Sequence, residues 1–238
     1  MRKSILALFF ALAVLFGLFA DVQPAAIAAS TDNSIKVQTI PGPTLAERML
    51  ERAKSSWPWY IIRASGIVAA VALLILILSG IGQVTGYTYR FLEPLTAWAS
   101  HRALGIAFGV SVSIHMFGLL FDHFVPFNIW QILIPWLSDY KVVTLFGLHL
   151  GSLYVAMGTL AFYLTMIIII TSLLWVEKKP IIWKWVHLLS YVVILFVFVH
   201  ALYLGTDLAD GLLRILWVGM GAAIAVSILY RLWRAKTI

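Results

Sequence analysis

Long runs without a charged residue dominate this chain after residue 58. Five such runs follow one another, over residues 64–89, 103–121, 142–176, 185–206 and 215–230. A membrane-spanning helix needs about 20 predominantly apolar residues, with a range of about 17–25. Each run therefore predicts one span, and the shortest is extended by the arginines at its ends, whose side chains reach the interface. The run over residues 142–176 exceeds one span, so we expect part of it to form an interfacial turn or a helix projecting from the membrane.

A further apolar run opens the chain. Arg2 and Lys3 precede 17 uncharged residues, and an Ala-Ile-Ala sequence that could be a cleavage site follows at residues 26–28. This pattern is typical of a secretory signal peptide, and the run is also long enough to be an uncleaved anchor. A short interfacial helix within residues 44–56 is the alternative to a plain linker after it. We predict a signal peptide or N-terminal anchor over residues 1–28, an extracytoplasmic linker over residues 29–58 and a membrane domain over residues 59–238.

Composition and charge support a membrane protein and indicate its orientation. The chain is 62% hydrophobic and 11% charged, whereas soluble domains are about 45–50% apolar and about 25% charged. If the N-terminal run leads out of the cytoplasm, ten basic and two acidic residues lie inside, against seven basic and eight acidic outside. This bias follows the positive-inside rule, so we expect a multi-pass protein of the plasma membrane with a cytoplasmic C-terminus. The net charge of +7 is explained by these loops, and we expect no nucleic-acid partner. The predicted fold class is an all-α integral membrane bundle of six spans, or five after signal cleavage.

Two of the apolar runs carry a pair of histidines each. His101 and His115 are fourteen residues apart in one span, and His187 and His200 are thirteen apart in another. Both spans run from inside to outside, so His101 and His187 (the inner pair) share one depth, while His115 and His200 (the outer pair) share another. At about 1.5 Å per residue the two depths are separated by roughly 20 Å, which fits two stacked cofactors within a hydrocarbon core of about 30 Å.

Histidine inside a bilayer is costly and usually functional. Neutral imidazole ligates haem iron, which offers two axial positions, whereas zinc sites take three or four clustered ligands. The chain has no cysteine, so thiolate and iron–sulfur sites are excluded. Two ligands at each depth therefore favour two stacked haems enclosed by the bundle. The alternative is that the four histidines only make hydrogen bonds between helices.

Other residues at these depths suit a haem. Glycines leave room for a flat ring beside the first histidine span, namely Gly105, Gly109 and Gly118. Basic residues are placed to pair with haem propionates, namely Arg102 and Lys184 at the inner depth and Arg63 and Arg214 at the outer depth.

The thirteen-residue spacing poses a geometric problem. On an ideal helix fourteen residues return to within about 40° of the same face, but thirteen miss it by about 140°. We expect a π-bulge, a tilted helix, or two haems rotated relative to each other. His149 falls in the outer third of the span predicted over residues 142–176, near the depth of the outer pair. Packing is its favoured role, with a propionate contact or an acceptor site as alternatives.

At these residues the chain resembles the ferric reductase-like transmembrane family. That family includes the haem cores of ferric reductases and NADPH oxidases and the haem subunit of a bacterial methionine-sulfoxide repair system. The resemblance covers roughly residues 59–231 and rests mainly on the 14/13 histidine spacing, with HRALG and WKWVHLLSY in support. It implies two b-type haems, one ligated by His101 with His187 and the other by His115 with His200. Arg63, in IIRASG, also resembles an arginine near the outer haem in the oxidase branch. That branch carries a second histidine four residues after the outer ligand, where this chain has a leucine, so superoxide production is not expected.

The expected function is electron transfer across the bilayer, as the haem subunit of a transmembrane oxidoreductase in contact with membrane lipid. Neither cytoplasmic loop has a glycine-rich phosphate-binding motif or the length of a nucleotide domain, so we expect no flavin or nicotinamide site in this chain. Electrons would come from a separate cytoplasmic flavin reductase or from quinol. They would leave to an extracytoplasmic acceptor such as ferric iron or a partner reductase. The alternatives are a haem-binding membrane protein without redox turnover, and a scaffold or transporter whose histidines sense pH.

Overall fold

The computed structural model describes residues 45–234, and this part of the chain contains five helices long and apolar enough to cross a membrane. They comprise Ser56–Thr85, Pro94–Phe121, Leu153–Leu174, Pro180–Leu204 and Gly211–Trp233. The five spans predicted after the N-terminal run are thus confirmed as helices of membrane-crossing length. The expected signal peptide or anchor over residues 1–28 lies outside the described residues.

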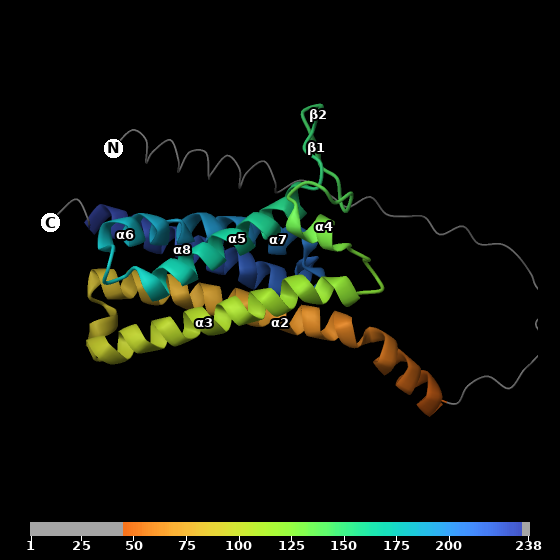
Figure 1. Cartoon of the computed structure of the whole chain (residues 1–238), viewed down its shortest axis with the longest axis horizontal. Helices are drawn as coiled ribbons and strands as arrows, with labels where there is room; N and C mark the ends of the chain where they lie inside the picture. The colour runs from red at the N-terminus through yellow and green to blue at the C-terminus, as the bar shows by residue number, and fades with distance from the viewer. Residues whose placement is uncertain (1–44, 235–238) are drawn as a thin grey trace, which may run out of the picture. The chain divides into compact units, whose positions relative to one another are not determined.

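The long helices lie side by side as two helical hairpins and a final helix (Figure 1). The first hairpin joins α2 (Leu45–Thr85) to α3 (Pro94–Gly118), and the second joins α5 (Leu153–Leu174) to the consecutive helices α6 (Pro180–Leu188) and α7 (Ser190–Leu204). The last helix, α8 (Gly211–Arg234), packs mainly against α2. Short elements connect them, namely η1 (Thr88–Arg90), η2 (Leu119–Phe121), α4 (Ile129–Leu133), β1 (Thr144–Leu145), β2 (Leu148–His149) and η3 (Thr206–Leu208).

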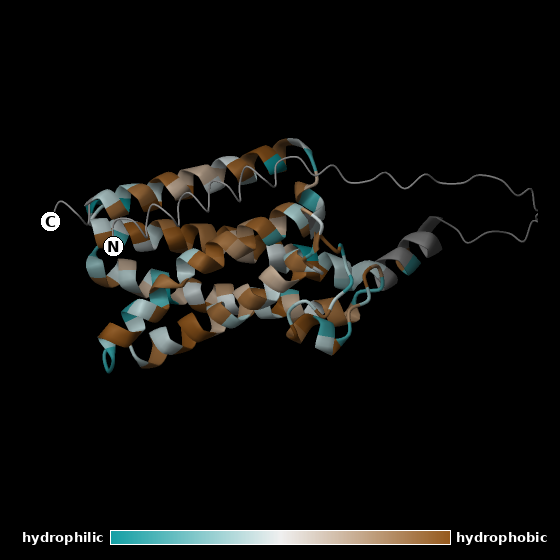
Figure 2. Ribbon diagram, turned by 90° about the horizontal axis from the view of Figure 1, so that it is seen from above, coloured by the Kyte–Doolittle hydropathy of each residue, from teal (hydrophilic) through white to brown (hydrophobic). Residues whose placement is uncertain are grey.

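Apolar side chains cover both the inside and the outside of this bundle. On α2, Leu73 and Leu74 are buried, whereas Val71 and Ile75 on the same stretch are exposed. Figure 2 shows apolar residues all along the helices and more hydrophilic residues at many of the turns. A helix satisfies its own backbone hydrogen bonds, so it can expose such a surface to lipid, which is as apolar as the side chains themselves. The exposed apolar surface therefore fits a membrane environment.

The predicted plain linker is wrong for residues 45–58. Helix α2 begins at Leu45 and continues through Pro58 into the first span. This stretch is rich in Leu, Glu, Arg and Ala, which are strong helix formers. The alternative helical interpretation of these residues therefore holds, although the helix is continuous with the span rather than separate.

The long apolar run over residues 142–176 contains a turn before α5, as expected, and this turn is a small β-hairpin. Strands β1 and β2 pair antiparallel, with Leu145 opposite Leu148. The two residues between them, Phe146 and Gly147, both have positive φ, of 50° and 78°, as a tight hairpin turn requires. The position predicted for His149, within a membrane span, is wrong because this residue lies on β2 before α5 begins.

The short helix α4 rests against α5. It begins with a capping box between Asn128 and Gln131. Near its C-terminal end, the carbonyls of Ile132 and Leu133 accept hydrogen bonds from the hydroxyls of Thr159 and Tyr163 on α5, at 3.1 and 2.5 Å. The last carbonyls of a helix have no partner within it, and these hydroxyls satisfy two of them.

The second histidine span is interrupted. Helix α6 ends at Leu188 and α7 begins at Ser190. At the junction the amide of Leu189 donates to the carbonyl of Val186, three residues earlier, at 3.0 Å. Leu189 itself keeps helical backbone angles, with φ −63° and ψ −14°, so the span continues through one tightened turn, and no π-bulge occurs at this junction.

Candidate functional site

Two pairs of histidines face each other inside the bundle, at two levels along its length. His101 on α3 and His187 on α6 form the inner pair, with ring centroids 6.2 Å apart. His115 on α3 and His200 on α7 form the outer pair, with ring centroids 6.4 Å apart. The four histidines singled out in the sequence are thus brought together two by two. A single tightened turn at Leu189 lies between His187 and His200, so the segment that joins them departs from an ideal helix at that point.

The separation of the rings is too large for a direct hydrogen bond between them. A direct N–H···N hydrogen bond of about 2.9 Å would bring two imidazole centroids to about 5.2 Å. An imidazole nitrogen coordinates a metal ion at about 2.0–2.1 Å and lies about 1.1–1.2 Å from its own centroid, so two rings on opposite sides of one ion have centroids about 6.4 Å apart. The observed 6.2 and 6.4 Å leave room for such an ion. Rings that are simply neighbours reach the same separation, as Phe117 and Phe162 do at 6.1 Å.

Each outer histidine is anchored to a backbone carbonyl of the neighbouring helix. Nδ1 of His115 lies 2.9 Å from the carbonyl oxygen of Ile62 on α2, and Nδ1 of His200 lies 2.8 Å from that of Tyr154 on α5. A carbonyl only accepts hydrogen bonds, so Nδ1 carries the proton in both rings. In a neutral imidazole the other nitrogen, Nε2, then has a free lone pair, which is the form that binds a metal.

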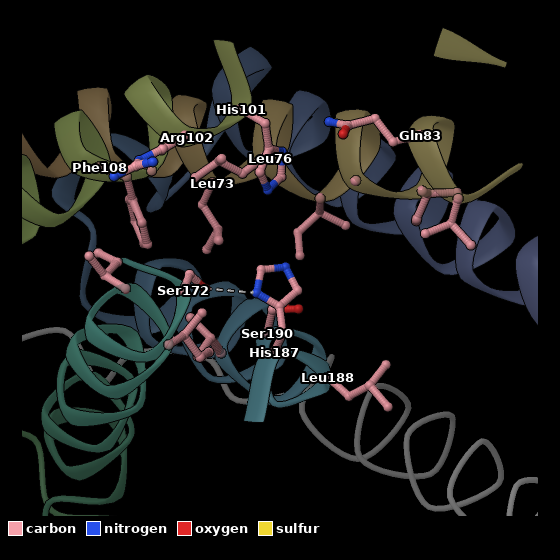
Figure 3. Close-up of a pocket in the computed structure, with 18 of the residues that line it drawn as sticks. Leu73, Leu76, Gln83, His101, Arg102, Phe108, Ser172, His187, Leu188 and Ser190 are labelled. Carbon is pink, nitrogen blue, oxygen red and sulfur yellow. Dashed lines mark hydrogen bonds between the residues drawn. The ribbon is translucent and has the colours of Figure 1, made fainter. Parts of the chain in front are cut away.

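The inner histidines contact serine hydroxyls instead. Ser79 on α2 donates to the carbonyl of Leu76 at 3.1 Å, and its oxygen lies 2.9 Å from Nδ1 of His101. The hydroxyl has one proton, so when it donates to Leu76 its oxygen accepts from Nδ1, and Nε2 of His101 is then the free nitrogen. Nδ1 of His187 lies 3.3 Å from the hydroxyl of Ser172 on α5 (Figure 3).

A cavity of about 630 Å³ surrounds the inner pair. In Figure 3, His101 and His187 point toward each other across this space, and Leu73 and Leu76 extend into it from α2. Gly105 also lines the cavity. Its size lies within the range of about 300–1,000 Å³ that is typical of small-molecule and cofactor sites, and its lining is mostly apolar.

Three cationic side chains line the same cavity. Arg102 and Lys184 were expected near the inner pair, and the structure adds Arg231 from α8. Arg231 donates to the hydroxyl of Tyr191, which also lines the cavity. The inner site therefore combines an apolar interior with positive charges that can neutralise an anionic group.

The basic residues expected at the outer depth are held by protein groups. Arg63 forms a two-pronged ion pair with Asp207, in which its Nε lies 2.7 Å from one carboxylate oxygen. The guanidinium of Arg63 also lies 4.8 Å from the ring centroid of Trp59. Arg214 donates to the backbone carbonyls of Leu208 and Ala209. The charge of Arg63 is thus balanced by a carboxylate of the protein, and the propionate contacts expected of these two arginines stay a prediction.

The glycines expected to make room for a flat ring have different roles. A methyl group at Gly105 would meet nothing within 4 Å in the described structure, consistent with its place on the cavity wall. A methyl group at Gly109 would lie 2.6 Å from Ile169, and one at Gly118 would lie 2.9 Å from Ile62. At Gly109 and Gly118 the space left by the glycine is thus filled by an isoleucine side chain of a neighbouring helix.

His149 lies apart from both pairs. It is exposed on the hairpin, where its Nδ1 lies 3.1 Å from the hydroxyl of Thr144 on the paired strand. This contact is local to the hairpin, so the structure shows neither packing within a span nor a contact with the outer pair.

Several residues of the site gave no signal in the sequence. Ser79 and Ser172 are single hydroxyls in apolar runs, and Arg231 has the position of an ordinary arginine at the end of a span. Their roles depend on which helices pack together, because each contacts or faces a histidine of another helix. Only an arrangement of the helices in space could have identified them.

The donor set suits a haem better than a bare metal ion. Within residues 45–234, no group of three or more His, Cys, Asp or Glu side chains is placed to hold a metal ion. Each level instead offers two imidazoles, at a separation that fits one ion between them. At the inner level an apolar cavity with three cations surrounds the pair. A flat apolar macrocycle with two axial positions and acidic substituents fits these features.

Comparison with known proteins provides no assignment. No protein-family model, no curated protein and no solved structure matches the chain.

Proposed function

We propose that this chain is the di-haem membrane subunit of a transmembrane oxidoreductase, carrying electrons across the bilayer to an extracytoplasmic acceptor. The observation that carries this proposal is the pair of facing imidazoles at each of two levels, 6.2 and 6.4 Å apart between centroids. The alternative, in which the histidines have only structural roles, accounts for the hydrogen bonds at Nδ1. It does not explain why the four histidines meet two by two at two levels of the bundle.

In this proposal the protein supplies ligation, orientation and a low dielectric. His101 with His187, and His115 with His200, would hold one b-type haem each, and haem supplies reversible one-electron chemistry when bound. The hydrogen bonds at Nδ1 hold the rings in place and make the imidazoles better donors. Along α3, the fourteen-residue spacing of its histidines separates the two levels by about 21 Å, so the two sites together extend over much of the hydrocarbon core.

The charges of the inner cavity support an electron entry at that end. Arg102, Lys184 and Arg231 are the cations that line it, and the same end is the cytoplasmic one if the positive-inside bias holds. The connections there are short, with residues 86–93 between α2 and α3 and residues 175–179 between α5 and α6. Neither described loop has room for a nucleotide domain. A separate flavin reductase or quinol is therefore the proposed donor, and ferric iron or a partner reductase the proposed acceptor.

The test is cofactor content followed by turnover. The purified chain should contain two low-spin haems, measured as pyridine haemochrome against protein concentration. In proteoliposomes, haem reduced from the inside should be re-oxidised by a ferric chelate added outside. Haem that binds but is not re-oxidised would favour haem binding without redox turnover, and absence of haem would refute the proposal.

A further inference from the structure

Both outer histidines lie directly against a glycine of the helix that anchors them. A methyl group at Gly66 on α2 would lie 2.9 Å from Nδ1 of His115, and one at Gly158 on α5 would lie 2.5 Å from Nδ1 of His200. Real Cβ atoms essentially never approach another heavy atom within 3.0 Å. Each imidazole therefore occupies the space that any larger residue at these positions would fill.

The same two glycines uncover the carbonyls that the histidines use. The acceptors are the carbonyls of Ile62 and Tyr154, and each lies four residues before one of the glycines. Side chains on a helix lean toward its N-terminus, so a residue covers the turn that precedes it. A glycine four residues after the carbonyl has no side chain to cover it, so an imidazole of the neighbouring helix can reach the carbonyl oxygen.

The arrangement occurs twice, once in each helical hairpin. In the first hairpin α2 carries Gly66 and Ser79, and α3 carries two histidines that contact these residues. In the second hairpin α5 carries Gly158 and Ser172, and α6 with α7 carries the other two. Two hairpins without evident sequence similarity thus anchor their histidines in the same way, with a glycine and carbonyl at the outer level and a serine at the inner level. Such repetition indicates a requirement of the site.

We propose that Gly66 and Gly158 are positioning residues of the outer site. By leaving the carbonyls of Ile62 and Tyr154 open, they hold the rings of His115 and His200 with the proton on Nδ1 and with Nε2 free for a ligand. The acceptors are backbone carbonyls, so truncating the side chains of Ile62 and Tyr154 would not remove them. What the sequence specifies is the glycine four residues later, which leaves each carbonyl accessible. The identity of the bound group rests on the proposed function, whereas the anchoring of the rings does not.

The chain offers a matched control for glycine-to-alanine substitution. A methyl group at Gly219 on α8 would meet nothing within 4 Å in the described structure. All three glycines lie inside long helices, where alanine is intrinsically preferred over glycine. A harmful effect confined to Gly66→Ala and Gly158→Ala therefore reports on the histidine contacts and not on the helix.

The first readout uses the haem-loaded protein. Gly66→Ala and Gly158→Ala should each weaken haem binding at the outer site by about 10–100-fold, the usual effect of disturbing the partners of a metal-ligating histidine, and should leave the inner haem in place. The imidazole planes cross at 86° in the outer pair and 52° in the inner pair, so the low-spin EPR signals of the two sites should differ. Residual outer haem in the variants should show an altered EPR signal and midpoint potential. Gly219→Ala should retain both signals.

The second readout requires no haem. In ¹⁵N-histidine-labelled protein in nanodiscs, the two ring nitrogens reveal which of them is protonated. Gly66→Ala should change the resonances of His115, and Gly158→Ala those of His200, with assignments from single histidine variants. Unchanged resonances in Gly66→Ala, the milder of the two substitutions, would overturn the inference. A wild-type protein that binds no haem but shows the expected ¹⁵N changes would refute the proposed function and leave the positioning role intact.

Discussion

Removing either member of a histidine pair should abolish the same haem. If His101 and His187 share one ion, then His101→Ala and His187→Ala each leave that ion with a single axial ligand. The haem content of each variant should fall from two per chain to about one. The double variant His101→Ala/His187→Ala should also retain about one, because its second substitution removes nothing further.

The magnitude follows from the geometry of the two pairs. Within each pair the ring centroids lie 6.2 or 6.4 Å apart, whereas the fourteen-residue spacing of His101 and His115 separates the levels by about 21 Å. Substitutions more than about 7–10 Å apart with no shared partner usually act independently, and those at one site do not. His101→Ala combined with His115→Ala should therefore remove both haems, in contrast to the double variant within a pair.

The assay is pyridine haemochrome stoichiometry together with a redox titration of the remaining haem. His101→Ala and His187→Ala should leave the same midpoint potential, and His115→Ala and His200→Ala should leave the other one. His149→Ala is the matched control, since it removes an imidazole from the exposed hairpin and should retain two haems. Four unrelated titration curves, or loss of both haems in the double variant of one pair, would refute the pairing.

Three further predictions address the surroundings of the site. Ser79→Ala should weaken haem binding at the inner site by about 10–100-fold, because it removes the partner of His101 Nδ1, and a titration with hemin measures this. Asp207→Asn should lower the free energy of unfolding by about 0.2–1 kcal/mol, the usual range for a partly exposed ion pair such as that with Arg63, as followed by thermal unfolding in detergent. The purified chain should not be reduced by NADPH alone in stopped-flow experiments. With an added flavin reductase the rate should fall as salt increases, because the basic inner face attracts an acidic partner at low ionic strength.

The spans could be predicted from the sequence because hydropathy is a local property. A segment of about 20 apolar residues is stable in lipid only as a helix or within a closed barrel, so each run after residue 58 predicted its helix without reference to the others. The candidate ligands were visible for a similar reason, since His101, His115, His187 and His200 are exceptional residues within such runs. The predictions were wrong where local composition was ambiguous, at residues 45–58, or where a long run hid a turn, at His149.

What only the tertiary structure decided is how the histidines are held. The anchors of the four rings lie on other helices, 15 to 53 residues away in the chain, and no periodicity of a single helix encodes such a contact. Glycines and serines are common in membrane helices, so Gly66 or Ser79 is informative only once the partner ring is seen against it. The tightened turn at Leu189 could not be predicted from the sequence either, since no proline or glycine lies there. The sequence by itself therefore determines the spans and places the four histidines within them, because burial in lipid acts on each segment separately. The pairing of the rings, the proton on Nδ1 and the cations around the inner cavity arise only when the two hairpins and α8 pack together, because each depends on a contact between segments.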